Sequence, residues 1–220
     1  MRLFDIFVSF VFLLILSPLF IFLIFLLKFT GEGEIFFFQE RVGYHGVNFK
    51  VMKFATMLKN SPNMGSGTIT SKNDQRILSV GRFLRKTKIN ELPQLWNVLR
   101  GDMSLIGPRP HAQRDLEGVS DDLLKLIHNV RPGLSGVGSL IFRNEEEILQ
   151  QFEDPRNFYD SVIAPYKAEL EIWYVYNRSF SLYIILLFLT AYVVVLGNNR
   201  IVYRLLSGLP VAPTRLVQYL

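Results

Sequence analysis

Charged and backbone-restricting residues are concentrated in KTKINELPQLWNVLRGDMSLIGPRP, residues 86–110. Glu91 stands beside an amide, Asn90, at the entry to a short apolar helix, and Asp102 follows that helix. A carboxylate at a helix entry lies at the positive end of the helix dipole, where its ionised form is favoured. Such a position suits a carboxylate that must attack a phosphorus atom or hold a metal ion. The candidate catalytic residues are therefore Glu91 and its neighbour Asn90, with Asp102 as another nearby acid.

A short helix is predicted directly after Glu91. Its apolar face consists of Leu92, Leu95, Trp96 and Leu99, at positions i, i+3, i+4 and i+7. Asn90 precedes this face as a good N-cap, Pro93 fits the first turn and Gly101 fits the end. Asn90 can therefore be interpreted either as the N-cap of this helix or as a residue of the catalytic site.

Two arginine motifs follow the predicted helix. Prolines on both sides of Arg109, in GPRP (107–110), fix the backbone and order the guanidinium for bidentate phosphate contact. Arg131 begins RPGLSG (131–136), in which glycines allow close approach of the backbone to a ligand. The two motifs, together with the acid at the helix entry, suggest a diphosphate site.

A further helix is predicted to begin near Val80, with Arg82, Arg85 and Lys86 at helical spacing on one face. This face is either a solvated surface or a basic stripe for phosphates or lipid headgroups. Segment 35–54 reads as two short strands around Gly43 to Gly46, and residues 58–74 read as a long loop.

Apolar residues are concentrated at the two ends of the 220-residue chain. The run from Ile6 to Leu27 is long enough, at roughly 33 Å as a helix, to cross a bilayer, and it is too long for a typical secretory signal. Ser17 and Pro18 interrupt its middle, so the helix either spans with a kink or returns as a re-entrant hairpin. Asp5 and Lys28 are expected at the headgroup level.

A second apolar run, Phe180 to Leu196, is at the short limit for a membrane span. We favour a helix that lies in the interface or packs on the domain, followed by a membrane-facing tail. The net charge of +5 suits anionic lipid or phosphate-bearing substrates. No zinc pattern, basic heptad helix or aromatic RNA-binding motif is present, so nucleic acid is not an expected partner.

Taken together, these motifs resemble the bacterial sugar transferases, which are monotopic phosphoglycosyl transferases. The resemblance covers nearly the whole chain and rests on the Ser17-Pro18 pair, QERVG (39–43), KFATM (53–57), GRFLRKTKINELPQLWNVLRGDMSLIGPRP (81–110), RPGLSG (131–136) and WYVYNRSF (173–180). It implies a small, mostly helical α/β domain, associated with the membrane through a re-entrant N-terminal helix and interfacial helices.

The resemblance also implies a reaction. Family enzymes move a sugar 1-phosphate from a UDP-sugar to undecaprenyl phosphate and release UMP, which is the first membrane step of surface polysaccharide or glycoconjugate synthesis. They require Mg²⁺, for which Glu91 is the expected ligand here, and hold a phosphosugar on an aspartate between half-reactions. We expect phosphate binding by Arg109, Arg131, Arg85 and Lys53.

Two positions depart from the family pattern. Asn90 stands where the nucleophilic aspartate is usual, and Ala55 stands where arginine is usual. A carboxamide is a very poor nucleophile, which leaves three readings: an inactive protein acting as a membrane scaffold, a reaction that depends on Glu91 as nucleophile or metal ligand, or direct transfer. We favour an enzyme with altered chemistry.

The resulting layout has four parts. Residues 1–30 form a re-entrant hairpin, 31–178 a cytoplasmic catalytic domain, 179–197 a membrane-associated helix and 198–220 a C-terminal tail. The expected location is the cytoplasmic face of the bacterial inner membrane, in contact with membrane lipid, because the middle of the chain carries most of the Lys and Arg.

Overall fold

The computed structural model describes residues 1–64, 74–113 and 121–219. The helices are α1 (Arg2–Ile15), α2 (Ser17–Lys28), α3 (Ser79–Lys86), α4 (Gln94–Arg100), α5 (Asp121–His128), α6 (Val137–Ile141), α7 (Glu145–Leu149), α8 (Pro155–Phe158), α9 (Ala164–Asn177), α10 (Phe180–Leu196) and α11 (Arg200–Leu205). The strands are β1 (Phe36–Val42), β2 (Asn48–Phe54), β3 (Ser104–Ile106) and β4 (Gly133–Ser135). The fold is therefore mostly helical α/β with small sheets, as the sequence predicted.

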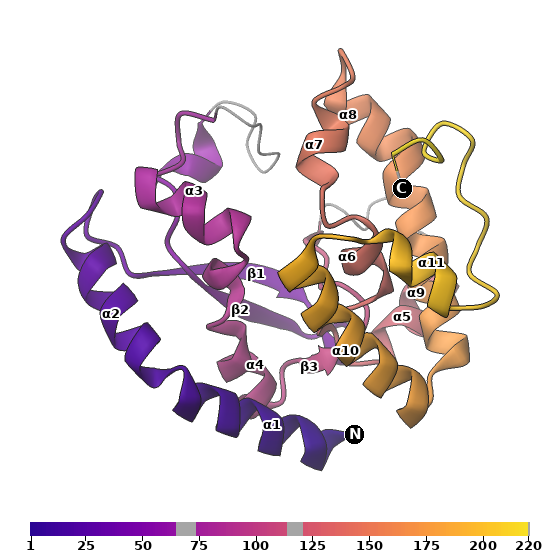
Figure 1. Cartoon of the computed structure of the whole chain (residues 1–220), viewed down its shortest axis with the longest axis horizontal. Helices are drawn as coiled ribbons and strands as arrows, with labels where there is room; N and C mark the ends of the chain where they lie inside the picture. Colours follow the sequence, from indigo (N-terminus) through magenta and orange to yellow (C-terminus); the bar gives the residue numbers. More distant parts are fainter. Residues whose placement is uncertain (65–73, 114–120, 220) are drawn as a thin grey trace.

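Two separate two-stranded sheets occupy the centre of the described chain. β1 and β2 form an antiparallel hairpin around the 3-10 turn Tyr44–Gly46, which confirms the predicted pair of strands. β3 and β4 pair in parallel. Figure 1 shows α3 above the β1–β2 hairpin and α4 below it, with α6, α7 and α9 to their right.

The N-terminal apolar run is divided into α1 and α2, which are bent by 61° relative to each other. Ser17 and Pro18 open the second helix. Proline has no N–H to donate to the Leu14 carbonyl, and the Ser17 hydroxyl donates to that oxygen instead at 2.8 Å. Pro18 thus occupies the first turn of a helix, where proline is tolerated.

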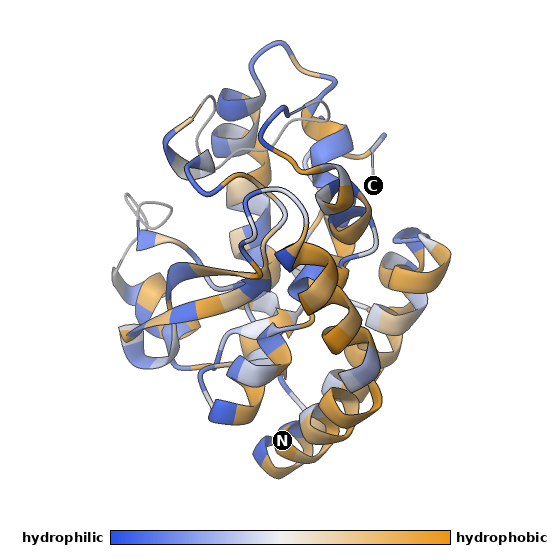
Figure 2. Ribbon diagram, turned by 90° about the vertical axis from the view of Figure 1, so that its left-hand side faces the viewer, coloured by the Kyte–Doolittle hydropathy of each residue, from blue (hydrophilic) through white to orange (hydrophobic). Residues whose placement is uncertain are grey.

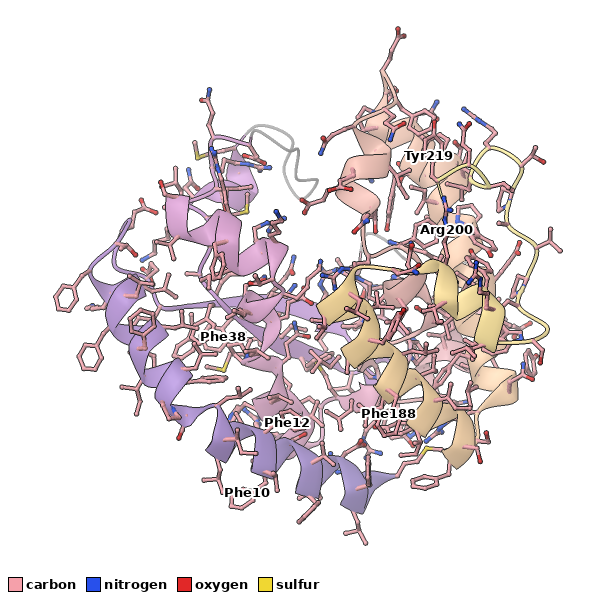
Figure 3. All side chains as sticks on the ribbon, in the orientation of Figure 1. Phe10, Phe12, Phe38, Phe188, Arg200 and Tyr219 are labelled. Atoms are coloured by element: carbon pink, nitrogen blue, oxygen red, sulfur yellow. The ribbon has the colours of Figure 1, made fainter. Side chains whose placement is uncertain are left out.

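None of the described helices is, by itself, long and apolar enough to cross a membrane; α1 and α2 meet that description when taken together across their bend. Both helices nevertheless expose large apolar side chains, namely Leu3, Phe7, Phe10, Phe12, Leu14, Ile15, Ile21, Phe22 and Phe25. Figure 3 shows Phe10 pointing outward at the lower edge, and Figure 2 shows mostly hydrophobic helices along the edge where the N-terminus lies. An exposed apolar surface of this extent is typical of a membrane or protein contact.

Asp5 is buried in the protein, contrary to the expectation that it contacts lipid headgroups. It is 2% exposed and accepts hydrogen bonds from the hydroxyls of Ser104, at 2.9 Å, and Tyr183. A buried carboxylate needs such donors, and these come from β3 and α10. Asp5 therefore fastens α1 to the body of the protein.

α10 packs on the domain along one side. Leu182, Leu186 and Leu189 are buried in the main core, whereas Phe188 and Val195 are exposed. The second apolar run was expected either to lie in the interface or to pack on the domain, and the structure shows that it packs on the domain.

The C-terminal tail was expected to face the membrane, and this is wrong for three of its apolar residues, whereas Leu205, Val211 and Val217 are exposed. Val202, Leu206 and Leu216 are buried in the main core. Figure 1 shows α11 at the right of the molecule, well above the lower edge formed by α1. Part of the tail therefore packs on the domain.

Candidate active site

The two arginine motifs lie side by side at the ends of β3 and β4. The Gly107 N–H donates to the Ser135 carbonyl at 2.9 Å, and the Gly133 N–H donates to the Pro108 carbonyl at 2.8 Å. A Cβ atom on Gly133 would lie 2.1 Å from the Gly107 nitrogen, so a side chain is excluded there. The close approach predicted for the RPGLSG glycines is therefore to neighbouring backbone and not to a ligand.

Arg109 follows Gly107 and Pro108 in the chain, and its backbone is bound by a residue of α9. Its backbone N–H donates to Oε1 of Glu171 at 3.3 Å. Glu171 is 2% exposed, and a Cβ atom on Gly138 would lie 2.8 Å from the same oxygen, so the glycine leaves room for the carboxylate. The position of Arg109 thus depends on Glu171, which was missed from the sequence.

Glu91 forms an ion pair with Lys53 of β2, with Oε1 and Nζ 3.2 Å apart. It ends the 3-10 turn Ile89–Glu91, which follows Lys88 in the left-handed conformation. Burial alone would raise the pKa of Glu91, but the positive charges of Lys53, Arg109 and Lys88 outweigh it and lower the pKa to about 2. The carboxylate is therefore ionised at neutral pH inside a cationic site.

Asn90 does not cap the following helix, so that prediction is wrong. The 3-10 turn and Pro93, which is the N-cap of α4, separate it from the helix. Asn90 is 6% exposed, and its buried Oδ1 accepts no hydrogen bond from the described part of the chain. Because a buried polar atom without a partner is costly, this oxygen is available to a ligand beside Glu91.

A second charged group lies on the other side of Arg109. Lys167 of α9 is buried and pairs with Glu145 of α7. Burial raises the pKa of Glu171 to about 7, although its bond to the Arg109 backbone and the charge of Lys167 lower it in part. The positive charge of Arg109 lowers the pKa of both Glu91 and Glu171, so the two groups are coupled electrostatically through this arginine.

The remaining predicted residues are placed elsewhere. Asp102, at the opposite end of α4 from Glu91, accepts a hydrogen bond from Asn97 Nδ2 at 3.2 Å. Arg131 also lies there, with Nε donating to the Gly101 carbonyl at 3.0 Å. Arg85 of α3 pairs with Glu146 of α7 at 2.6 Å. The structure therefore brings together Glu91, Asn90, Lys53 and Arg109, and leaves Asp102 and Arg131 outside that group.

The titration of Glu171 should be visible in the stability of the protein. Its pKa in the folded state, about 7, lies above the ordinary 4.5, so the folded state binds more protons between these values. The wild type should therefore lose up to about 3 kcal/mol relative to Glu171→Gln as pH rises from 4 to 8. Denaturant unfolding of both proteins across this range measures the difference, and Glu169→Gln, which changes an exposed acid of α9, is the control. A pH-independent difference between wild type and Glu171→Gln would contradict this placement.

Comparison with known proteins identifies the family. Residues 1–197 match the family model described as bacterial sugar transferase. The chain is 38% identical over 207 residues to the undecaprenyl-phosphate galactose phosphotransferase of Salmonella typhimurium. The matched region covers 88% of this chain and 40% of that protein.

Two further relatives support the same assignment. The chain is 36% identical over 158 residues to the exopolysaccharide production protein ExoY of Sinorhizobium fredii, covering 66% of this chain and 70% of that protein. It is 35% identical over 196 residues to a UDP-glucose:undecaprenyl-phosphate glucose-1-phosphate transferase of Klebsiella pneumoniae, covering 87% and 39%. This chain thus spans well under half the length of the Salmonella and Klebsiella proteins. It belongs to the bacterial sugar transferase family.

Proposed function

We propose that this protein transfers a sugar 1-phosphate from a UDP-sugar to undecaprenyl phosphate and releases UMP, as a membrane step of surface polysaccharide synthesis. The observation that carries the proposal is the ionised Glu91, paired with Lys53 and next to Arg109, in a chain of this family. The Salmonella and Klebsiella relatives are named as an undecaprenyl-phosphate galactose phosphotransferase and a UDP-glucose:undecaprenyl-phosphate glucose-1-phosphate transferase.

The proposed step exchanges one phosphorus–oxygen bond for another. A phosphate oxygen of the lipid acceptor bonds to the β-phosphorus of the donor, and the bond from that phosphorus to the bridging oxygen breaks. UMP leaves with the bridging oxygen, and a polyprenyl diphosphosugar remains. Lys53 and Arg109 supply positive charge for the diphosphate, which is the main requirement of phosphoryl transfer.

Two residues of the 3-10 turn, Asn90 and Glu91, suit Mg²⁺. Among the described residues no cluster of three or more His, Asp or Glu side chains could hold a metal by itself. Magnesium commonly takes one or two protein oxygens and completes its shell with water and substrate phosphates. The Glu91 carboxylate and the unpartnered Asn90 Oδ1 provide such oxygens. When bound there, the ion would neutralise charge on the diphosphate.

The amide at position 90 favours transfer without a covalent intermediate. The neutral amide of Asn90 has no anionic oxygen for attack, and the Glu91 carboxylate is already held by Lys53. We infer that the acceptor phosphate attacks the donor directly.

Intact-protein mass spectrometry with UDP-sugar alone tests this inference. The wild type should show no phosphosugar adduct, whereas Asn90→Asp, which restores a carboxylate of nearly the same size, should form one. An adduct that appears on the wild type and disappears in Glu91→Gln would contradict direct transfer and assign the nucleophile to Glu91.

We further propose that α1 and α2 form a re-entrant hairpin on the cytoplasmic face of the inner membrane, with residues 31–178 as the catalytic part. Their bend of 61° and their exposed apolar side chains support this arrangement. The chain has no cysteine, so a single cysteine in place of Leu3, which is 84% exposed, can be labelled selectively. In intact cells it should resist a membrane-impermeant reagent. Labelling from outside would show a simple span.

A turnover assay tests the proposed activity. The purified chain in detergent, supplied with Mg²⁺, undecaprenyl phosphate and a panel of UDP-sugars, should release UMP with at least one sugar. UMP release should require the lipid acceptor. Absence of release with every sugar would contradict the proposal.

The second candidate function is an inactive membrane scaffold in a glycan-assembly complex. Asn90 in place of aspartate, and Ala55, which is buried directly after β2 where arginine is usual, favour it. The same assay separates the two functions, because a scaffold releases no UMP.

A further inference from the structure

A polar cavity of about 220 Å³ lies at the N-terminal end of α1, outside the Glu91 group. Three arginines line it: Arg2 from α1, Arg131 from the segment before β4, and Arg178 from the junction of α9 and α10. A single water needs roughly 10–15 Å³ of such space, so the cavity holds a much larger polar group.

The three arginines have no acidic partner in the described part of the chain. Within the described ranges none of them forms an ion pair. Arg2 donates to the carbonyl of Leu99 at 2.8 Å. Arg178 contacts the Met1 sulfur at 3.5 Å and also interacts with the Tyr174 side chain. The one acid of the lining, Asp5, already accepts hydrogen bonds from Ser104 and Tyr183. The lining of the cavity therefore carries more positive than negative charge.

Arg131 is oriented by groups that leave its terminal nitrogens available. Its Nε donates to the Gly101 carbonyl at 3.0 Å, and its guanidinium lies 4.7 Å from the centroid of the Tyr44 ring. Both contacts fix the plane of the guanidinium, and neither uses an anion. A fixed guanidinium with free N–H groups suits bidentate binding of a phosphate.

The cavity also lies next to apolar surface. Leu3 and Phe7 on α1 are 84% and 66% exposed, and Phe180 at the start of α10 is 55% exposed. A phosphate bound between these residues could carry an acyl or polyprenyl chain toward the apolar face. We propose that this cavity binds the phosphate group of a membrane lipid, at a site separate from Glu91. The proposal rests on the membrane association proposed above and not on the transfer reaction.

Vesicle flotation with the full chain tests the site. The double variant Arg131→Gln, Arg178→Gln removes two charges of the cavity and spares Arg2, which binds carbonyls of α4. It should bind phosphatidylcholine vesicles that contain phosphatidylglycerol about tenfold more weakly than the wild type. The control is Arg200→Gln, Arg204→Gln, which removes two exposed charges from α11, and it should change binding less than about twofold. Figure 3 shows Arg200 far from α1. Equal losses in both variants would indicate diffuse attraction and overturn the proposal, as would no loss in the cavity variant.

Thermal unfolding in detergent identifies the source of the phosphate. Phosphatidylglycerol, undecaprenyl phosphate and inorganic phosphate are added separately to the wild type and to the cavity variant. Stabilisation by one or both lipids that is lost in the variant supports the proposal and names the lipid. Stabilisation by inorganic phosphate alone, or identical shifts in both proteins, overturns it. UMP release is measured separately, so failure of the transfer reaction and failure of this site give different results.

Discussion

Glu91→Gln is expected to abolish turnover, with kcat reduced by roughly a thousandfold. The substitution keeps the size of the side chain and removes its charge, which leaves Lys53 without its ion-pair partner. It also removes the carboxylate that would join Asn90 in holding Mg²⁺. The measurement is UMP release under saturating UDP-sugar and undecaprenyl phosphate, with folding checked by thermal unfolding.

Glu169→Gln is the matched control for this experiment. Glu169 is an exposed acid on α9, so the same chemical change there should leave turnover within about twofold of wild type. Full activity of Glu91→Gln would show that the reaction does not depend on this acid, and Asp102 would be the next candidate.

Arg109→Gln should lower kcat/KM by roughly two orders of magnitude, because it would remove the charge-assisted contact that we propose between Arg109 and the donor phosphates. The fold should tolerate the change, since the contact with Glu171 is made by the backbone N–H of residue 109 and remains. Arg109→Lys should recover part of the activity, because it restores the charge without the bidentate geometry.

Arg82→Gln provides the comparison for Arg109. Arg82 is exposed on α3, so its loss tests whether general positive charge near the site is sufficient. Equal losses in Arg82→Gln and Arg109→Gln would contradict a specific phosphate role for GPRP.

The sequence located the elements of the site better than their contacts. The strands around Tyr44 and the apolar helix at Phe180 follow from local residue patterns, and the structure contains both. The N-cap prediction for Asn90 failed because Lys88 adopts a left-handed conformation and opens a separate 3-10 turn. Backbone conformation of this kind is decided by tertiary packing and not by the residues alone.

The separation of Arg131 from Arg109 could not be predicted from spacing. Both arginines flank the paired strands β3 and β4, but which side each one reaches depends on the crossing at Gly107 and Gly133. The two arginine motifs suggested a single phosphate site, but in the structure Arg109 lies beside Glu91 and Arg131 lies beside Gly101.

The burial of Glu171 and Asp5 is indicated by their positions on their helices. Glu171 shares a helix face with Lys167, four residues earlier, beside the buried Leu170 and Tyr174. Asp5 similarly shares a face with the buried Ser9 of α1. Charged or polar residues in pairs on an otherwise apolar helix face indicate a buried polar contact, although the partner is known only from the fold.

The most direct test of the proposed reaction follows the β-phosphorus of the donor. The wild-type chain is incubated with Mg²⁺, undecaprenyl phosphate and a UDP-sugar labelled with ³²P at the β-phosphate, and the lipid is extracted. Transfer of a sugar phosphate should place the label in the lipid fraction, in amounts equal to the UMP released, and Glu91→Gln should show neither product. Label that stays in the aqueous phase as UDP while sugar enters the lipid would show a simple glycosyl transfer, and label that stays in intact UDP-sugar would show a protein without this activity.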